Sequence, residues 1–309
     1  MPMRLTASQV AGKTEATEGN KETLAANDCV LVKGATFAPN IDMYPRDLLR
    51  GTMSRDSPLS GQRSAKLTFT CEMAGSGNKG VAPAWGKFMQ GCGFNETISA
   101  NNSVTYTPLT NNMTNSMSLS TYQDGVIKKT WGARGSAKIT IEAGKPGLIE
   151  FAFEGCDFEV VDGSLLSPTY STIVPPTFLN AALTIDTWAA ISQKIELDVA
   201  NILQKRASIS ASSGYLSTLI TGRNPKGSMD PELTLKATYD VYGKWQTPGT
   251  LGSLSISANG TTGNIITITC PKVRYAAISD QDRGGLRTLG LDFEPCVNSA
   301  DDEISIVLT

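Results

Sequence analysis

Residues 136–162, SAKITIEAGKPGLIEFAFEGCDFEVVD, decide the fold that this sequence predicts. Apolar side chains fall on alternate positions on both sides of a Gly-Lys-Pro-Gly turn, at Ile139, Ile141, Ile149, Phe151 and Phe153. A period of two is typical of strands with one buried face, so the stretch predicts an antiparallel hairpin. The other face of this hairpin carries polar side chains, namely Lys138, Thr140, Glu142, Glu150 and Glu154.

A second alternating stretch begins at Ser253, with an Asn-Gly-Thr-Thr-Gly turn between Leu254 and Ile256 on one side and Ile266, Ile268 and Cys270 on the other. We take it as a copy of the first hairpin, because other features also recur in the same order. We therefore predict a tandem duplication. The predicted parts are a polar N-terminal arm (1–27), a first β domain (28–176) and a second, shorter β domain (177–309), with a proline-containing linker at 163–176.

Composition excludes several function classes. The chain has 27 basic and 29 acidic residues, so no strongly charged surface for nucleic acid or anionic lipid is expected. It has no histidine, which removes the usual general base and the commonest metal ligand. Gly75 to Gly80 spell Gly-x-Gly-x-x-Gly, but the neighbouring strands alternate like antiparallel ones, so we interpret this as a flexible loop. We predict no catalytic, cofactor-binding or metal residues, and no enzyme activity.

The sequence also lacks a signal peptide, a membrane-spanning segment and a Cys-x-x-Cys motif. Residues 1–27 lack the continuous apolar core of a signal peptide, and no apolar run is long enough to cross a bilayer. The sequence therefore predicts no membrane anchor and folding in a cytoplasm. The six cysteines never form a Cys-x-x-Cys pair, and we expect most of them to be buried free thiols.

A combination of short segments, strongest over residues 28–155, resembles the major tail (tail tube) proteins of long-tailed, siphovirus-type bacteriophages. The segments are residues 55–61, the strand 66–73, Ala-Gly-Ser-Gly at 74–77, Pro-Ala-Trp-Gly to Gly-Cys-Gly-Phe at 83–94, Tyr-Thr-Pro at 106–108, Gly-Ala-Arg-Gly at 132–135 and Ala-Gly-Lys-Pro-Gly at 143–147.

The resemblance implies tandem tail-tube-type β-sandwich or partial-barrel domains, each with a short flanking helix. It also implies a structural virion protein that polymerises as stacked rings, through whose lumen the genome is ejected. Two domains in one chain would make the ring a homotrimer with pseudo-sixfold symmetry. Implied partners are the chain itself, tail terminator and distal tail proteins, and double-stranded DNA in transit; the implied place is the virion tail, assembled in the host cytoplasm.

The site expected for such a protein is a lumen face rather than an active site. We predict that the polar faces of the two hairpins line the lumen, through Glu142, Glu150, Glu154, Ser255, Thr267 and Thr269. Packing of this face on the helix or on outside solvent is the alternative reading. A carbohydrate-binding virion surface or adhesin β-sandwich protein remains the alternative function.

Overall fold

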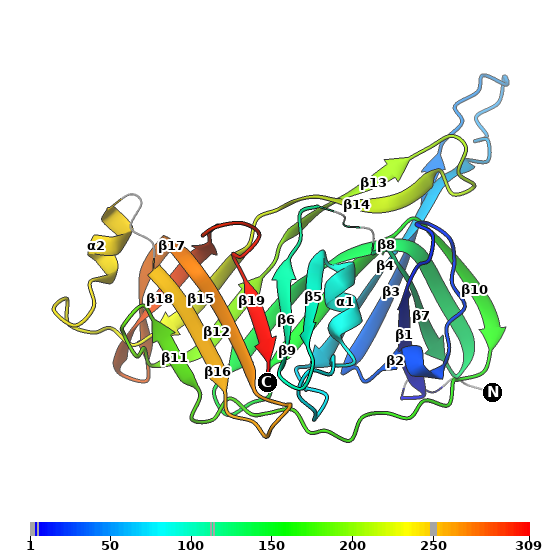
Figure 1. Ribbon diagram of the computed structural model, residues 1–309. Coiled ribbons are helices and arrows are strands. Elements are labelled where there is room, and N and C mark those ends of the chain that lie inside the picture. Colours follow the sequence, from blue (N-terminus) through cyan, green and yellow to red (C-terminus); the bar gives the residue numbers. More distant parts are fainter. Residues whose placement is uncertain (1–3, 5, 112, 114, 248–251) are drawn as a thin grey trace.

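The computed structural model describes the chain except residues 1–3, 5, 112, 114 and 248–251 (Figure 1). The described residues form a mainly β protein with short flanking helices, as predicted, and its sheets do not close into a barrel. The strands of the first half are β1 Ser8–Thr14, β2 Cys29–Val30, β3 Gly34–Tyr44, β4 Leu59–Glu72, β5 Phe94–Ser99, β6 Ser103–Pro108, β7 Met117–Gln123, β8 Gly125–Glu142, β9 Leu148–Gly155 and β10 Asp157–Gly163.

The second half continues the same sheets. Its strands are β11 Ala182–Ile185, β12 Ser192–Asp198, β13 Asn201–Ala207, β14 Tyr215–Arg223, β15 Lys226–Pro231, β16 Gly252–Ala258, β17 Ile266–Arg283, β18 Leu286–Pro295 and β19 Ser305–Leu308. The helices are α1 Gly86–Gly91 and α2 Val241–Gln246, and Ala26–Asp28 forms one 3-10 turn.

Eight strands form one antiparallel sheet that crosses both halves, in the order β3-β4-β9-β8-β12-β15-β18-β17; we call it the long sheet. The predicted hairpin is its centre, since β8 and β9 pair from Arg134↔Glu154 to Thr140↔Leu148. The junction between the halves is the pairing of β8 with β12.

Two strands of 18 residues, β8 and β17, each belong to two sheets. The first part of β8 pairs with β7 and β10, in a sheet that continues to β1 and β2, whereas its last part joins the long sheet. The first part of β17 pairs with β16 and β19, in a sheet that runs β11-β16-β17-β19-β6-β5, which we call the hydroxyl sheet. The last part of β17 pairs with β18 in the long sheet.

The two 18-residue strands have similar pairings. The first part of β8 pairs with β7 and its last part with β9, whereas the first part of β17 pairs with β16 and its last part with β18. Within β17, buried and exposed residues alternate on both sides of the bend, so by alternation alone either part resembles the second strand of a hairpin such as β8–β9.

One core cluster extends through both halves. In the first half, α1 buries Phe88 against Phe69, with ring centroids 5.0 Å apart, and Phe151 and Phe153 complete the aromatic centre. Large aromatic side chains supply much of the apolar area that stabilises such a core. The helix is predictable from Pro83 and the glycines that bracket it, and these buried faces orient the polar side of the long sheet outward.

The N-terminal segment differs from the predicted polar arm, because Ser8–Thr14 is strand β1, paired with β7 and β2. Val10 and Ala11 are fully buried there. Gly12 is required by close packing: a Cβ at this position would lie 2.4 Å from a ring carbon of Phe88. The short alternation of small residues gave too weak a signal for a strand.

A buried carboxylate fixes the chain just after β1. Glu15 is 7 % exposed and accepts four hydrogen bonds, from Ser116 Oγ (2.6 Å), Ser118 Oγ (2.9 Å), Gly132 N (2.7 Å) and Gly19 N (2.8 Å). Buried charges are tolerated when every lone pair is satisfied in this way. The N-terminal segment is thereby fastened to β7 and β8 of its own chain.

Candidate functional site

The polar face of the long sheet is the candidate functional surface. Along β8 and β9, buried residues such as Ile139 and Phe151 alternate with partly exposed or exposed ones such as Lys138 and Glu150. The same alternation continues in β12, where Ile195 and Leu197 are buried. Side chains on the opposite side from the core thus form one continuous face across both halves.

Charges of opposite sign alternate across the strands of this face. One row runs Glu150, Lys138, Asp198 and Lys226 on four adjacent strands. Glu196 lies between two lysines, with Nζ of Lys138 at 2.8 Å and Nζ of Lys194 at 2.5 Å from its carboxylate oxygens. Hydrogen bonds from Lys138 and then Lys194 lower the pKa of Glu196 below its usual value. The face is therefore mixed in charge rather than acidic.

The three predicted glutamates lie on this face. Glu150 is exposed, Glu142 pairs with Lys145 at 2.6 Å, and Glu154 has Nζ of Lys205 at 3.9 Å. Their basic neighbours were not included in the prediction, although alternation alone places Lys138 beside Glu150.

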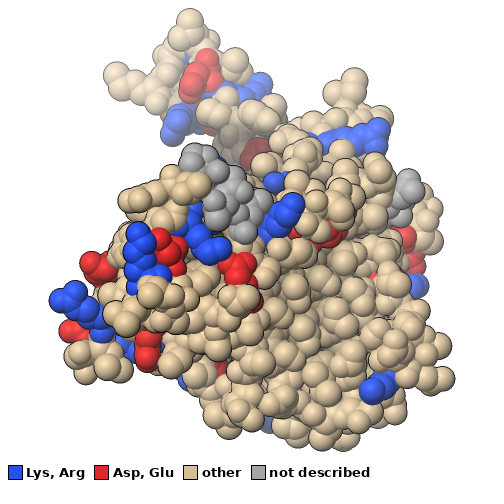
Figure 2. Space-filling model, turned by 60° about the vertical axis from the view of Figure 1, so that its left-hand side comes forward, with Lys and Arg blue, Asp and Glu red and all other residues tan. Residues whose placement is uncertain are grey.

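The three predicted hydroxyl residues lie elsewhere. Ser255, Thr267 and Thr269 belong to β16 and the first part of β17, and their outward face is that of the hydroxyl sheet. The Oγ of Ser255 lies 3.5 Å from Oγ1 of Thr269, and the strands β16, β19 and β6 contain no charged residue. Figure 2 shows a broad area without charged side chains on this side of the molecule. The structure does not bring these residues together with the glutamates, because they lie in the hydroxyl sheet and the glutamates lie in the long sheet.

The long sheet ends in two strand edges. At one end β3 pairs with β4, and at the other end residues 274–283 of β17 pair with β18; no further strand partner is seen for either edge within the described residues. Between Gly34 and Ile41 the β3 edge carries no charged side chain. Exposed edges without charges are templates for pairing with another chain.

Two segments project from the same end of the molecule (Figure 1). The connection between β3 and β4, residues 45–58, carries Leu49 and Met53 with their side chains fully exposed. The β13–β14 hairpin, inserted between β12 and β15, carries fully exposed Ile209 near its tip. Exposed apolar side chains on projecting segments are typical of surfaces that contact another protein.

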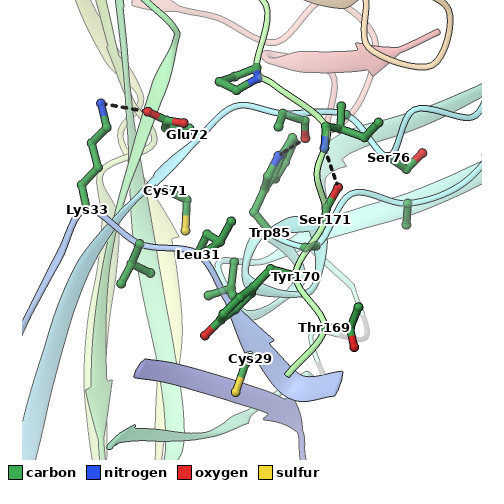
Figure 3. A pocket seen from close by; sticks show the side chains of 18 of the residues that line it. Cys29, Leu31, Lys33, Cys71, Glu72, Ser76, Trp85, Thr169, Tyr170 and Ser171 are labelled. Carbon is green, nitrogen blue, oxygen red and sulfur yellow. Dashed lines mark hydrogen bonds and ion pairs between the residues drawn. The ribbon is translucent and has the colours of Figure 1, made fainter. Parts of the chain in front are cut away.

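An apolar cavity of about 740 Å³ lies at the opposite end of β4 (Figure 3). Leu31, Trp85 and Tyr170 point into it, and the linker residues 169–175 form one wall. Trp85 Nε1 donates to the carbonyl of Ala74 at 2.9 Å, and Nζ of Lys33 lies 3.1 Å from Glu72. These groups hold the loop after β4 in place and do not form a nucleophile with a base.

Metal ligands, membrane-spanning helices and reactive thiols are the other features that bear on function. Among the described residues no cluster of His, Cys, Asp or Glu could hold a metal ion, and no helix is long and apolar enough to span a membrane. Five cysteines are buried free thiols and Cys296 is partly exposed. Burial raises the pKa of the Cys71 thiol to about 12, which makes it unreactive.

A continuous polar sheet face with two free edges and projecting apolar segments defines a self-associating structural β protein. The chain belongs to the phage tail tube protein family, whose model matches residues 6–305. No curated protein matches the sequence. Membership of this family makes the chain a structural component of the phage tail that assembles with copies of itself and with other tail proteins.

Proposed function

We propose that three copies of the chain close into a ring and that the rings stack into the tail tube, with the polar face of the long sheet lining the lumen. The observation that carries the proposal is the composition of the long sheet. It consists of two successive units of four strands, β3-β4-β9-β8 and β12-β15-β18-β17, joined in one chain and ending in two free edges.

The correspondence of the two units supports a tandem duplication. In each unit the last two strands form a hairpin, the 18-residue strand bends into a second sheet, and a short helix follows the second strand in sequence. The units are joined inside the chain by an edge pairing, β8 with β12. The same pairing between chains would give a closed ring of six units from three copies.

The wall that we propose for the lumen has alternating charges. Glu142, Glu150 and Glu154 remain our lumen residues in the first unit. In the second unit we replace Ser255, Thr267 and Thr269 by the polar side chains of β17 and β18, such as Arg274, Asp292 and Glu294. Alternating charges of nearly equal number give no net attraction to the phosphate backbone, so DNA passes without being held.

The projecting segments would make the contacts between one ring and the next. The 45–58 connection and the cavity beside Trp85 lie at opposite ends of β4, so a copy displaced along the strand direction brings an exposed apolar tip to the other end of the next ring. At the two ends of the tail, the same surfaces would contact the tail terminator and distal tail proteins. Assembly would occur in the host cytoplasm. The genome would be ejected through the finished tube. The protein acts without enzymatic chemistry, and no observation on the described residues favours carbohydrate binding.

Electron microscopy of the purified protein tests the proposal. The wild type is expected to form stacked rings with an axial channel, and the variant Leu49→Asp/Met53→Asp is expected to form rings that do not stack. The matched control is Val297→Asp, which places the same charge at another exposed apolar residue (62 % exposed). Persistent monomers, or compact trimers without a channel, would overturn the proposal.

A further inference from the structure

We infer the register of the seam between neighbouring copies: Thr36 of β3 lies opposite Gln281 of the next copy's β17, flanked by Gly34 opposite Arg283 and Ala38 opposite Ser279. The inference rests on the proposed ring. It adds to that proposal a specific antiparallel pairing of two identified edges, and it is argued from the junction that each chain already contains.

The template is the pairing of β8 with β12. It comprises five residue pairs, from Lys194↔Glu142 to Asp198↔Lys138. Beyond its two ends, Ala143 N donates to the Gln193 carbonyl (2.9 Å) and Val199 N donates to the Ala137 carbonyl (3.0 Å). Since hydrogen-bonded pairs alternate along an antiparallel ladder, the pairs on the core side are the hydrogen-bonded ones. The pairs on the polar face are non-hydrogen-bonded, with Cα atoms about 4.5 Å apart.

The strand β3 takes the place of β12 in the repeated unit. Leu197 of β12 pairs with Gly227 of β15, which pairs with Phe293 of β18. In the first unit, Phe37 of β3 pairs with Leu67 of β4, and Leu67 pairs with Phe153 of β9. Phe153 and Phe293 each begin a Phe-Glu-x-Cys segment, so we take them as matching positions. Phe37 then corresponds to Leu197.

The last part of β17 takes the place of the last part of β8. Ile139 pairs with Ile149, which lies four residues before Phe153. Asp280 pairs with Leu289, which lies four residues before Phe293. Asp280 therefore corresponds to Ile139. Leu197 pairs with Ile139 inside the chain, so Phe37 of one copy pairs with Asp280 of the next, and the other pairs follow.

The two edge strands, β3 and the last part of β17, can pair only over a length similar to that of the β8–β12 pairing. On β3, Pro39 stands where Val199 stands in β12 and has no N–H to donate, so the ladder ends there. On β17, the bulge between Tyr275 and Ala277 interrupts the strand near the corresponding point. Both strands therefore permit pairing over about the five residues that the template uses.

The outer side of the seam offers an unpartnered aromatic surface. Tyr242 of α2 donates its hydroxyl to Oδ1 of Asp280 at 3.0 Å, yet 39 % of the residue is exposed, and Trp245 is 44 % exposed. The corresponding helix α1 instead buries Phe88 and Met89 completely. In the inferred register Phe37 of the next copy lies beside Asp280 and Tyr242, so the neighbouring copy covers this aromatic surface.

Disulfide trapping in assembled tubes tests the register, in a Cys296→Ser background because the other native cysteines are buried. The pairs Thr36→Cys with Gln281→Cys, and Ala38→Cys with Ser279→Cys, are in register and suit a disulfide. The control pair Thr36→Cys with Ser279→Cys is diagonal, with Cα atoms about 7–8 Å apart. We expect at least tenfold more covalent dimer and trimer on non-reducing gels from either in-register pair than from the control.

Equal yields from all pairs, or a higher yield from the diagonal pair, would overturn the register while leaving the tube intact. Absence of rings in the wild type, seen by microscopy, would instead overturn the proposed function. Circular dichroism of each variant under reducing conditions identifies one that fails to fold, and the second in-register pair then decides.

Discussion

The buried carboxylate of Glu15 allows a quantitative test of how the N-terminal segment is held. Replacement by alanine leaves the backbone N–H groups of Gly19 and Gly132 without an acceptor, whereas the two serine hydroxyls that also contact Glu15 can rotate to other partners. An unsatisfied buried polar group costs about 1–3 kcal/mol. Gly132 is buried, but Gly19 is only half-buried and water can reach it, so Glu15→Ala should lower the free energy of unfolding by about 1–4 kcal/mol.

Glutamine at the same position separates hydrogen bonding from packing. Each carboxylate oxygen accepts one backbone N–H, from Gly132 at Oε1 and from Gly19 at Oε2. The amide of glutamine therefore satisfies one of the two in either orientation and leaves the other facing an NH₂ group. Glu15→Gln should cost about half as much as the alanine variant, about 0.5–2 kcal/mol.

The assay is equilibrium urea denaturation followed by tryptophan fluorescence, at a concentration where the protein sediments as a monomer. Glu22→Gln is the control, because Glu22 lies on the same segment and pairs with Lys13 at the surface; it should leave the midpoint unchanged. A Glu15→Gln variant as stable as the wild type would refute the account of this site, as would equal costs for the two Glu15 variants.

Two further predictions concern the core and the junction with the β13–β14 hairpin. Phe88→Ala should lower the free energy of unfolding by about 3–5 kcal/mol in the same assay, since the ring is fully buried in the aromatic centre; a loss below 1 kcal/mol would contradict that packing. Burial raises the pKa of Glu18, but hydrogen bonds from Arg134 and Ser217 outweigh it, so the folded-state pKa lies below the ordinary value of 4.5. The stabilisation by Glu18 is therefore complete above pH 4.5 and is lost as the pH falls through the folded-state pKa; amide hydrogen exchange of β14 should increase there, and a Glu18→Gln variant should lack this step.

Local patterns in the sequence predicted the elements that have one buried face and a clear end. The β8–β9 hairpin follows from the alternation of Ile139 to Phe153 around the turn, and α1 follows from Pro83 and the glycines around Trp85. The strand β1 was missed because it presents only Val10 and Ala11 to the core and is otherwise polar. Its place is set by pairing with β7, more than a hundred residues away in sequence, which no local pattern encodes.

The candidate site was predictable on one strand pair and not across the sheet. Alternation placed Glu142, Glu150 and Glu154 on one face, and the structure keeps them together. In the second half, Ser255, Thr267 and Thr269 lie apart from the glutamates because one strand belongs to two sheets, and a bend leaves the period of two unchanged. The bends become visible only in the structure, where β8 and β17 are each 18 residues long and each pairs with different strands before and after its bend.

The pairing of β8 with β12 also has a consequence for the folding and unfolding of the chain. Had the two units been separate molecules, this contact would carry the entropic cost of association and would depend on concentration. Within one chain the cost is that of closing a loop, which grows only slowly with loop length. Because β6 also pairs with β19, neither half can detach without exposing strand edges of the other, and we expect both halves to melt in a single transition. In the ring that we propose, each β8–β12 junction would thus be formed before assembly begins, and only the seams between copies would respond to subunit concentration.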